Sequence, residues 1–288
     1  MAVKFFGQFL VEKGLVTRDN LLAAIELQDQ KNLKLGEVAV TMGYITAADI
    51  QKARIAQLSK DMRLGDMLVD MGLLTIVQLC EVIIQQNKIH LYIGEALVLV
   101  GALSPEALQK HLDAFKADQA QYVSDGIELP IHSANNSIWE MTADLTFKMI
   151  TRVLDLQFRT EKCTIISRIA PAFMLAAMDF SGDITARYLI SVSEGAQQSI
   201  ARAILCEQSV EHEPVEVLED TVREFANVVC GNVAAKASQM GIDMEIHPPE
   251  TLHPPLEGLP VPDGFTALSF PIHIQDGDRM ELILLVRE

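Results

Sequence analysis

Residues 1–115 contain four copies of one pattern, spaced 29 residues apart. Two glycine columns, a valine column and a hydroxyl column recur at this spacing: Gly7, Gly36, Gly65 and Gly94; Gly14, Gly43, Gly72 and Gly101; Val11, Val40, Val69 and Val98; Thr17, Thr46, Thr75 and Ser104. One such unit cannot bury its own apolar face, so the four copies must pack on one another. Repeat arrays act as scaffolds or sensors more often than as catalysts, which directs the search for chemistry to the rest of the chain.

Each copy predicts two short helices. The segment after the first glycine has apolar residues at helical spacing and stops at the second glycine, which suits a left-handed position. The hydroxyl column then stands where an N-cap is expected. Thr46 with Asp49 fits a capping box, and Ser104 before Pro105 fits an N-cap followed by proline at N1. The second helices carry an apolar marker at one position: Leu21, Ile50, Leu79 and Leu108. We therefore expect an all-α helical repeat array over residues 1–118.

The formal net charge of −16 is unevenly distributed along the 288 residues. Residues 1–125 sum to −3, and the remaining residues sum to −13. An acidic second half argues against nucleic acid as a partner, because phosphate binding needs clustered Lys and Arg. It is compatible with a protein partner that presents positive charge, and equally with a role in solubility alone.

Two further observations bear on the compartment. The sequence has no run near the roughly 18 apolar residues of a membrane helix, and residues 1–14 acquire charge too early for a signal peptide. Cys80, Cys163, Cys206 and Cys230 stand apart, which favours four buried thiols over disulfides or a zinc site. We expect a cytoplasmic protein with no membrane insertion.

The repeat pattern resembles the N-terminal domain of type II secretion and pilus assembly ATPases over about residues 4–115. Some members of that family bind cyclic di-GMP through a motif that begins Arg-Leu-Gly. Here only the third copy, Arg63-Leu64-Gly65, begins in this way. An arginine at that position could stack on a guanine and form two hydrogen bonds with it. The alternative, which the residues alone favour, is that Arg63 is a solvated residue at the start of a helix.

The second half begins after a polar stretch, and we place a linker at residues 119–129 and a second domain at residues 130–288. Helices are predicted over residues 133–156, 194–206 and 214–240. Strands are predicted over residues 163–169, 173–180, 186–193, 243–247, 266–274 and 280–286, with a proline-rich loop at 248–264. Residues 181–183 and 275–278 have the composition of hairpin turns. This order predicts an α+β domain, with helices packed on a mainly antiparallel sheet.

Residues 220–241 are the most informative part of this half. Apolar residues at helical spacing define a core face: Val222, Phe225, Val229, Val233 and Ala237. Glu224 and Asn227 are three residues apart, so their side chains share another face of the helix. Gly231 and Asn232 follow one turn later. From the spacing alone, this polar pair indicates a solvated helix face.

The pattern Glu-x-x-Asn-x-x-x-Gly-Asn, followed by small residues and Met-Gly-Ile-x-x-Glu-Ile, resembles the CheX branch of the CheC/CheX/FliY family of chemotaxis phosphatases. The turn at residues 180–183 and the loop with Pro260, Pro262 and Gly264 agree with it. The resemblance covers roughly residues 130–288 and implies a CheC/CheX-like fold. It also implies a homodimer through the C-terminal domain.

In that family, the helix bearing Glu and Asn is laid against the active site of a phosphorylated CheY-like response regulator. The resemblance implies that Asn227 orients the attacking water and that Glu224 anchors the partner by pairing with a lysine. The phosphoaspartate and its Mg²⁺ belong to the partner, so this chain needs no cofactor or metal. The first helix of the domain carries Glu140 but no second Glu-x-x-Asn pair, so we expect one site per domain.

Three other candidates are set aside. Ser181 lacks a Gly-x-Ser-x-Gly elbow and an evident base. His247 and His253 lack a third metal ligand at a suitable spacing, and we interpret them as solvated loop residues. Trp139 lies among apolar residues and is expected in the core.

Two classes of function remain open at this point. The first is a phosphatase for a response-regulator aspartate, with the repeats as a regulatory or targeting module. The second is a non-catalytic signalling adaptor that binds a response regulator, a cyclic di-nucleotide or a secretion or motility component. The presence of both Glu224 and Asn227 favours the first class. The long repeat scaffold leaves room for the second.

Overall fold

The computed structural model describes residues 3–120, 126–207, 209–274 and 277–287. The chain divides into two compact units, Met1–Gln121 and Tyr122–Glu288, and each is described by itself. Among the described residues, no helix has both the length and the apolar character that crossing a membrane requires.

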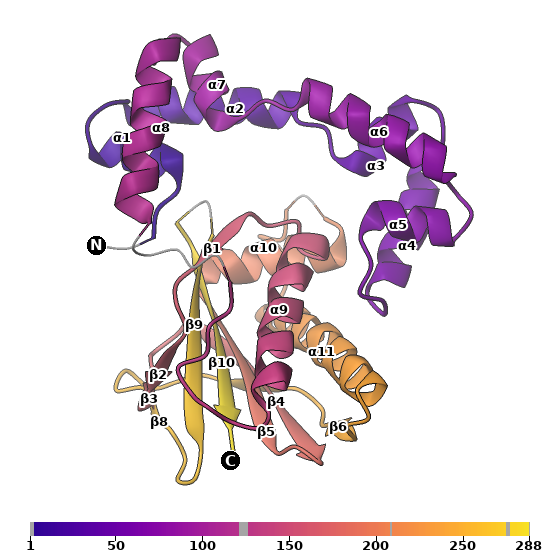
Figure 1. Cartoon of the computed structure of the whole chain (residues 1–288), viewed down its shortest axis with the longest axis vertical. Helices are drawn as coiled ribbons and strands as arrows, with labels where there is room; N and C mark the ends of the chain where they lie inside the picture. Colours follow the sequence, from indigo (N-terminus) through magenta and orange to yellow (C-terminus); the bar gives the residue numbers. More distant parts are fainter. Residues whose placement is uncertain (1–2, 121–125, 208, 275–276, 288) are drawn as a thin grey trace. The chain divides into compact units, whose positions relative to one another are not determined.

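The described part of the first unit consists of four helix pairs, one for each sequence repeat (Figure 1). The pairs are α1 (Phe6–Glu12) with α2 (Arg18–Lys31), α3 (Leu35–Thr41) with α4 (Ala47–Gln57), α5 (Leu64–Asp70) with α6 (Ile76–Ile89), and α7 (Ile93–Leu99) with α8 (Pro105–Gln119). The prediction of an all-α N-terminal part is therefore confirmed.

The predicted helix ends are also confirmed. In each repeat, the hydroxyl residue is the N-cap of the second helix and accepts a hydrogen bond from the backbone N–H three residues later: Thr17, Thr46, Thr75 and Ser104. The second glycine column has φ angles of +67°, +73°, +69° and +74°. Because other residues are strained in this left-handed region, glycine ends each first helix and lets the chain turn back.

The first glycine column has a packing explanation. A Cβ atom added at Gly65 would lie 2.6 Å from Cδ1 of Leu79, the apolar marker of the same repeat. The other three copies give the same contact: Gly7 with Leu21, Gly36 with Ile50, and Gly94 with Leu108. Glycine therefore allows the second helix of each repeat to close against the first.

The repeats pack in pairs rather than in chain order. Contacts of α2 with α7 and of α1 with α8 join the first repeat to the fourth, around Phe9, Leu10 and Phe115. Contacts of α3 with α6 and of α4 with α5 join the second repeat to the third, in a separate apolar cluster. Asn32 at the end of α2 donates to the carbonyl of Leu91 at 2.9 Å and accepts from its N–H at 2.7 Å. These hydrogen bonds join the segment between the first and second repeats to the segment between the third and fourth repeats. Both segments connect one repeat pair to the other.

The second unit is an α+β domain, as predicted. Its helices are α9 (Asn136–Arg152), α10 (Glu194–Leu205) and α11 (Val215–Gln239). Its strands are β1 (Phe158–Thr160), β2 (Thr164–Ile166), β3 (Arg168–Ile169), β4 (Met174–Gly182), β5 (Ala186–Val192), β6 (Met244–Ile246), β7 (Glu250–Leu252), β8 (Leu259–Pro260), β9 (Thr266–Ile274) and β10 (Arg279–Val286).

The main sheet has the strand order β1-β9-β10-β5-β4-β6, with β2 beside β9 and β7 beside β4. These pairs are antiparallel, and β3 with β8 forms a separate two-stranded sheet. The longest helix, α11, contacts α9, α10 and β4 (Figure 1). Among the strands, α11 contacts β4, β5, β6 and β7, so it covers the end of the sheet that β4 and β6 form.

The differences from the prediction concern short edge strands and turns. β1 was not predicted, and β7 and β8 lie in the stretch predicted as a proline-rich loop. Ser181 and Gly182 belong to β4 rather than to the following turn. The β9–β10 pair is confirmed, although Gln275 and Asp276 of its predicted turn lie outside the described residues.

The expectation of four buried thiols is wrong. Cys230 is buried in α11 and Cys163 is partly buried, but Cys80 and Cys206 are exposed. Cys206 follows α10 in a left-handed conformation at φ +58°, which turns it out of the helix. Cys80 lies on a face of α6 that points away from the apolar cluster of its repeat pair.

Candidate functional site

α11 is fixed in its rotation by the core. The five apolar residues predicted on its buried face are all 0% exposed: Val222, Phe225, Val229, Val233 and Ala237. Because they recur at three- and four-residue intervals, they hold one side of the helix against the sheet and the neighbouring helices. The opposite side is left for other contacts.

Glu224 and Asn227 lie on this open side of α11. Glu224 is exposed, and Asn227 is half-buried. Asn227 Nδ2 donates to Glu224 Oε2 at 3.4 Å, so the two side chains share the helix face that their spacing indicates. The core residues on the other side therefore position a carboxylate and an amide together at the surface.

The charges around Glu224 are already paired with one another. Asp220 forms an ion pair with Arg223, and Glu219 lies 3.3 Å from Nε2 of His253. Within the described part of the chain, Glu224 forms no ion pair. Its carboxylate can therefore accept a cation from another molecule without first breaking a pair within this chain.

Gly231 continues the same face one turn beyond Asn227. A Cβ atom added at Gly231 would meet no atom within 4 Å, so packing within the unit does not require a glycine here. Glycine in the interior of a helix costs roughly 0.5–1 kcal/mol relative to alanine. The missing side chain leaves room for another surface to approach the helix backbone beside Asn227.

Asn232 does not belong to this face. It is 9% exposed, and its Nδ2 donates to the Val228 carbonyl one turn earlier at 2.8 Å. The open face therefore consists of Glu224, Asn227 and Gly231.

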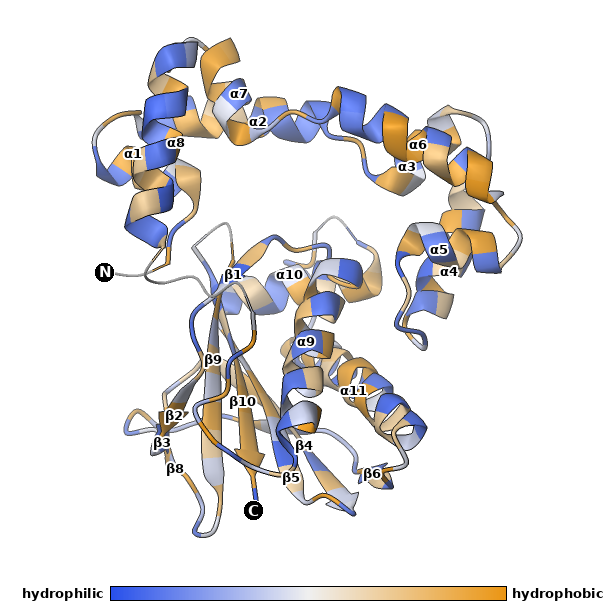
Figure 2. Ribbon diagram, viewed as in Figure 1, coloured by the Kyte–Doolittle hydropathy of each residue, from blue (hydrophilic) through white to orange (hydrophobic). Residues whose placement is uncertain are grey.

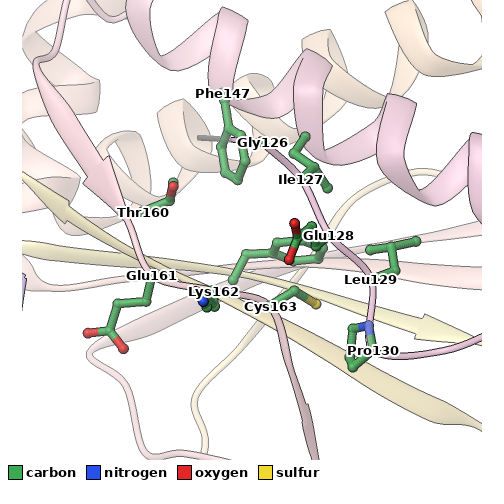
Figure 3. Close-up of a pocket in the computed structure, with 11 residues that line it drawn as sticks. Gly126, Ile127, Glu128, Leu129, Pro130, Phe147, Thr160, Glu161, Lys162 and Cys163 are labelled. Carbon is green, nitrogen blue, oxygen red and sulfur yellow. The ribbon is translucent and has the colours of Figure 1, made fainter. Parts of the chain in front are cut away.

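A separate pocket of about 190 Å³ lies between residues 126–130, Phe147 of α9 and residues 160–163 (Figure 3). Its lining includes neither Glu224 nor Asn227. Burial raises the pKa of Cys163 in this pocket to about 12. The thiol is therefore protonated near neutral pH and cannot serve there as a thiolate nucleophile.

One contact was missed by sequence reasoning. Ser181 Oγ lies 2.8 Å from Nε2 of His247, so Ser181 does have a base beside it. The two residues are 66 positions apart and meet because β4 pairs with β6. Only the strand pairing brings them together, and no local motif indicates it. This exposed pair is not part of the Glu224–Asn227 face.

The remaining candidates are placed as follows. Trp139 is 1% exposed and lies in the core, as predicted. His253 contacts Glu219 and the Phe173 carbonyl, and no group of three His, Cys, Asp or Glu among the described residues could hold a metal ion. Arg63 is exposed and is the N-cap residue of α5. The equivalent residues of the other repeats are Phe5, Lys34 and Tyr92.

Comparison with known families finds a similar domain in the second unit. Residues 174–273 match the family model described as chemotaxis phosphatase CheX. This stretch includes β4, β5, α10 and α11, and therefore both Glu224 and Asn227. The second unit thus contains a CheX-like domain. A search of the curated proteins found no match.

Solved structures of CheX and CheC-like proteins resemble the second unit. CheX from Desulfovibrio desulfuricans is 14% identical, with a TM-score of 0.45, over 52% of this chain and 99% of its own. The CheX of a CheX–CheY–BeF3–Mg complex from Borrelia burgdorferi is 19% identical, with a TM-score of 0.46, over 52% and 98%. A CheC-like protein from Shewanella sp. PV-4 is 15% identical, with a TM-score of 0.44, over 55% and 100%.

Proposed function

We propose that this protein removes the phosphoryl group from the phosphoaspartate of a CheY-like response regulator. The observation that carries the proposal is the Glu224–Asn227 pair on the open face of α11, within the residues that match the CheX family model. Glu224 anchors the regulator, and Asn227 orients the attacking water. The repeats of the first unit serve as a regulatory or targeting module.

The proposed hydrolysis requires few chemical groups from this chain. A water molecule attacks phosphorus in line with the bond to the aspartyl oxygen, that bond breaks, and the products are inorganic phosphate and a free carboxylate. The amide of Asn227 can accept a hydrogen bond from the water and donate one, so it can hold the water in line. No group in this chain has to change its protonation state, and the Mg²⁺ that neutralises the phosphoryl oxygens belongs to the regulator.

The surroundings of the pair suit this role. The Glu224 carboxylate, which forms no ion pair among the described residues, offers a partner lysine a charge-assisted hydrogen bond, and Gly231 leaves space for the partner's surface. The buried face of α11 keeps Asn227 in one place, which matters because a misplacement of about 1 Å can cost roughly 100-fold in rate. The CheX of Borrelia burgdorferi was crystallised with CheY, a partner of the class proposed here.

The test separates the roles of the two residues. The decay of a phosphorylated CheY-like regulator is measured over a range of concentrations of wild type, Asn227→Ala and Glu224→Ala. Asn227→Ala should lower the maximal rate by roughly 100-fold or more, because the water is no longer held. Glu224→Ala should raise the concentration needed for half-maximal rate by roughly 10- to 100-fold.

The same decay assay includes a control variant and can give a result that contradicts the phosphatase. Glu216→Ala changes an exposed acidic residue in the first turn of α11 and should leave both quantities unchanged. Equal decay for all four proteins, with several regulators, would contradict the phosphatase. The non-catalytic adaptor would then be the better account, with Arg63 as the first residue to test for cyclic di-GMP binding.

A further inference from the structure

α6 carries apolar residues on two faces. One face contributes Val82 and Ile89 to the cluster shared by the second and third repeats. The other face, which we call the apolar stripe, consists of Ile76, Val77, Cys80, Ile83 and Ile84. Its members are exposed, at 69% for Ile76, 67% for Val77, 39% for Ile83 and 54% for Ile84. A helix that is apolar on both sides normally has both sides covered.

The other repeats show that the helix pair does not require this stripe. At the five equivalent positions, the first copy has Arg18, Asp19 and Glu26, and the fourth has Glu106 and Asp113. The second copy has Arg54, and the stripe of the third copy has no charged residue. Figure 2 shows the difference: much of the α6 ribbon has the hydrophobic colour, whereas α8 is mostly hydrophilic. Packing within the repeat therefore does not explain the stripe.

The stripe is symmetric about Cys80. Ile76 and Ile84 lie four residues before and after it, and Val77 and Ile83 lie three before and after. Two α6 helices that cross antiparallel at Cys80 would set Ile76 of each copy against Ile84 of the other. The smaller Cys80 at the crossing point permits a close approach of the two helices. Such an arrangement is the self-complementary surface that a twofold interface needs.

The charges on α6 do not oppose this pairing. Glu81 is its acidic residue, and its carboxylate is already engaged by the hydroxyl of Tyr44 in the same chain. Lys88 lies in the last turn, beyond the stripe. The stripe can therefore be covered without enclosing an unpaired charge.

The area of the apolar stripe determines how strongly two copies of the chain are expected to associate. Five partly exposed side chains of this size offer roughly 300–500 Å² per copy, and thus about 600–1,000 Å² in total. This is at the small end of specific interfaces, which are weak and transient. We propose that α6 forms a reversible, antiparallel homodimer contact through the apolar stripe, centred on Cys80. The contact is independent of the phosphatase site and of its partner.

The first test is the dimer content of the full-length protein by sedimentation velocity between about 1 and 100 µM, a range suited to a weak interface. Ile84→Glu should abolish association through the stripe, whereas a dimer through the C-terminal domain, which the family resemblance implies, would persist equally in Ile84→Glu and in the control. The matched control is Leu22→Glu on α2, because Leu22 is 55% exposed and lies at the position equivalent to Cys80. This control should associate as the wild type does. Far-UV circular dichroism of both variants checks that their helices are retained.

The second test needs no destabilising change. In a Cys206→Ser background, Cys80 is the exposed thiol that remains, since Cys163 is partly buried and Cys230 is buried. Mild oxidation should give a disulfide-linked dimer, and peptide mass spectrometry should identify a Cys80–Cys80 bond. The proposal is overturned if Ile84→Glu associates as strongly as the wild type does and oxidation of the Cys206→Ser protein gives no Cys80–Cys80 bond, because the dimer contact would then lie elsewhere. It is also overturned if Cys80 of the monomer is protected from a maleimide, because the chain's own second unit would then cover the stripe.

Discussion

Gly231 is a residue whose identity the folded unit does not need. It lies in the interior of α11, where glycine is unfavourable, and a Cβ atom there would meet nothing within 4 Å. We expect Gly231→Ala to raise the free energy of unfolding of the second unit by roughly 0.5–1 kcal/mol. Urea unfolding followed by the fluorescence of Trp139 measures this free energy, because Trp139 is the chain's single tryptophan and is buried in α9.

A larger side chain at the same position tests the docking face. Gly231→Leu should fold, because the space is open, but should weaken regulator binding by roughly 10-fold or more through steric exclusion. Titration of the phosphorylated regulator against both variants measures this effect. Normal binding by Gly231→Leu would show that the regulator does not approach α11 beside Asn227.

The thiols of Cys163 and Cys230 predict how the free energy of unfolding depends on pH. Burial raises the pKa of Cys163 to about 12 and raises the pKa of Cys230 well above 9.0. Above pH 9 the unfolded chain loses these protons and the folded chain keeps them, so the free energy of unfolding falls as pH rises. Cys230, which is buried, contributes a slope of up to about 1.4 kcal/mol per pH unit, and the partly buried Cys163 contributes less because solvent screens it.

Urea unfolding followed by Trp139 fluorescence at pH 8, 9 and 10, with reductant, measures this slope. Between pH 8 and 9 the curves should nearly coincide, and the fall should begin above pH 9. Cys230→Ala should reduce the slope by about half or more, because Cys230 is the more deeply buried thiol. A slope that does not change in Cys230→Ala would show that other groups are responsible.

At the scale of single residues, much of the structure could be predicted from the local sequence. The N-cap at Thr46 and the left-handed glycine at Gly72 depend on neighbouring residues, and both predictions hold. The contact of Ser181 with His247 depends on the pairing of β4 with β6. No local pattern encodes such a contact, so it could not be predicted.

At the scale of elements, capping decides where the repeat helices begin. Thr46 accepts from the N–H of Asp49 and its own N–H donates to the Asp49 carboxylate, closing a capping box on α4. Thr46→Ala should cost about 1 kcal/mol and speed amide exchange in α4 roughly 5-fold. Hydrogen exchange read by mass spectrometry tests this, with the exposed, non-capping Thr41→Ala as the control.

The long elements were predicted more completely than the short ones. α9, α10, α11 and the β9–β10 hairpin follow from periodicity and length. β7 and β8 consist of three and two residues in a proline-rich stretch, and they form because a longer strand or another edge segment lies beside them. Propensity carries little information about such strands, since the neighbouring backbone determines them.

At the scale of the whole molecule, the pairing of repeats could not be predicted. The four copies carry the same signals, so the sequence does not distinguish packing in chain order from packing of the first repeat with the fourth. The structure gives two apolar clusters where a simple stack would give one continuous core.

The division into two units predicts how the molecule responds to truncation. The second unit has its own sheet, helix layer and Glu224–Asn227 pair. We expect removal of residues 1–118 to change the rate of regulator dephosphorylation without abolishing it, because the modulatory role that we propose for the first unit concerns a site that it does not contain. The measurement is the decay rate with full-length and truncated protein at equal concentration. Complete loss of activity in a truncated protein that retains its folded Trp139 signal would contradict a modulatory role.

The central claim is that this chain turns over its partner rather than only binding it. The most direct test is to mix a radiolabelled phosphorylated CheY-like regulator with a tenfold smaller amount of this protein and count the phosphate released per molecule. The account predicts several phosphates per molecule for the wild type, and loss of this turnover in Asn227→Ala. Release of no more than one phosphate per molecule, with binding intact, would contradict it and indicate sequestration of the regulator.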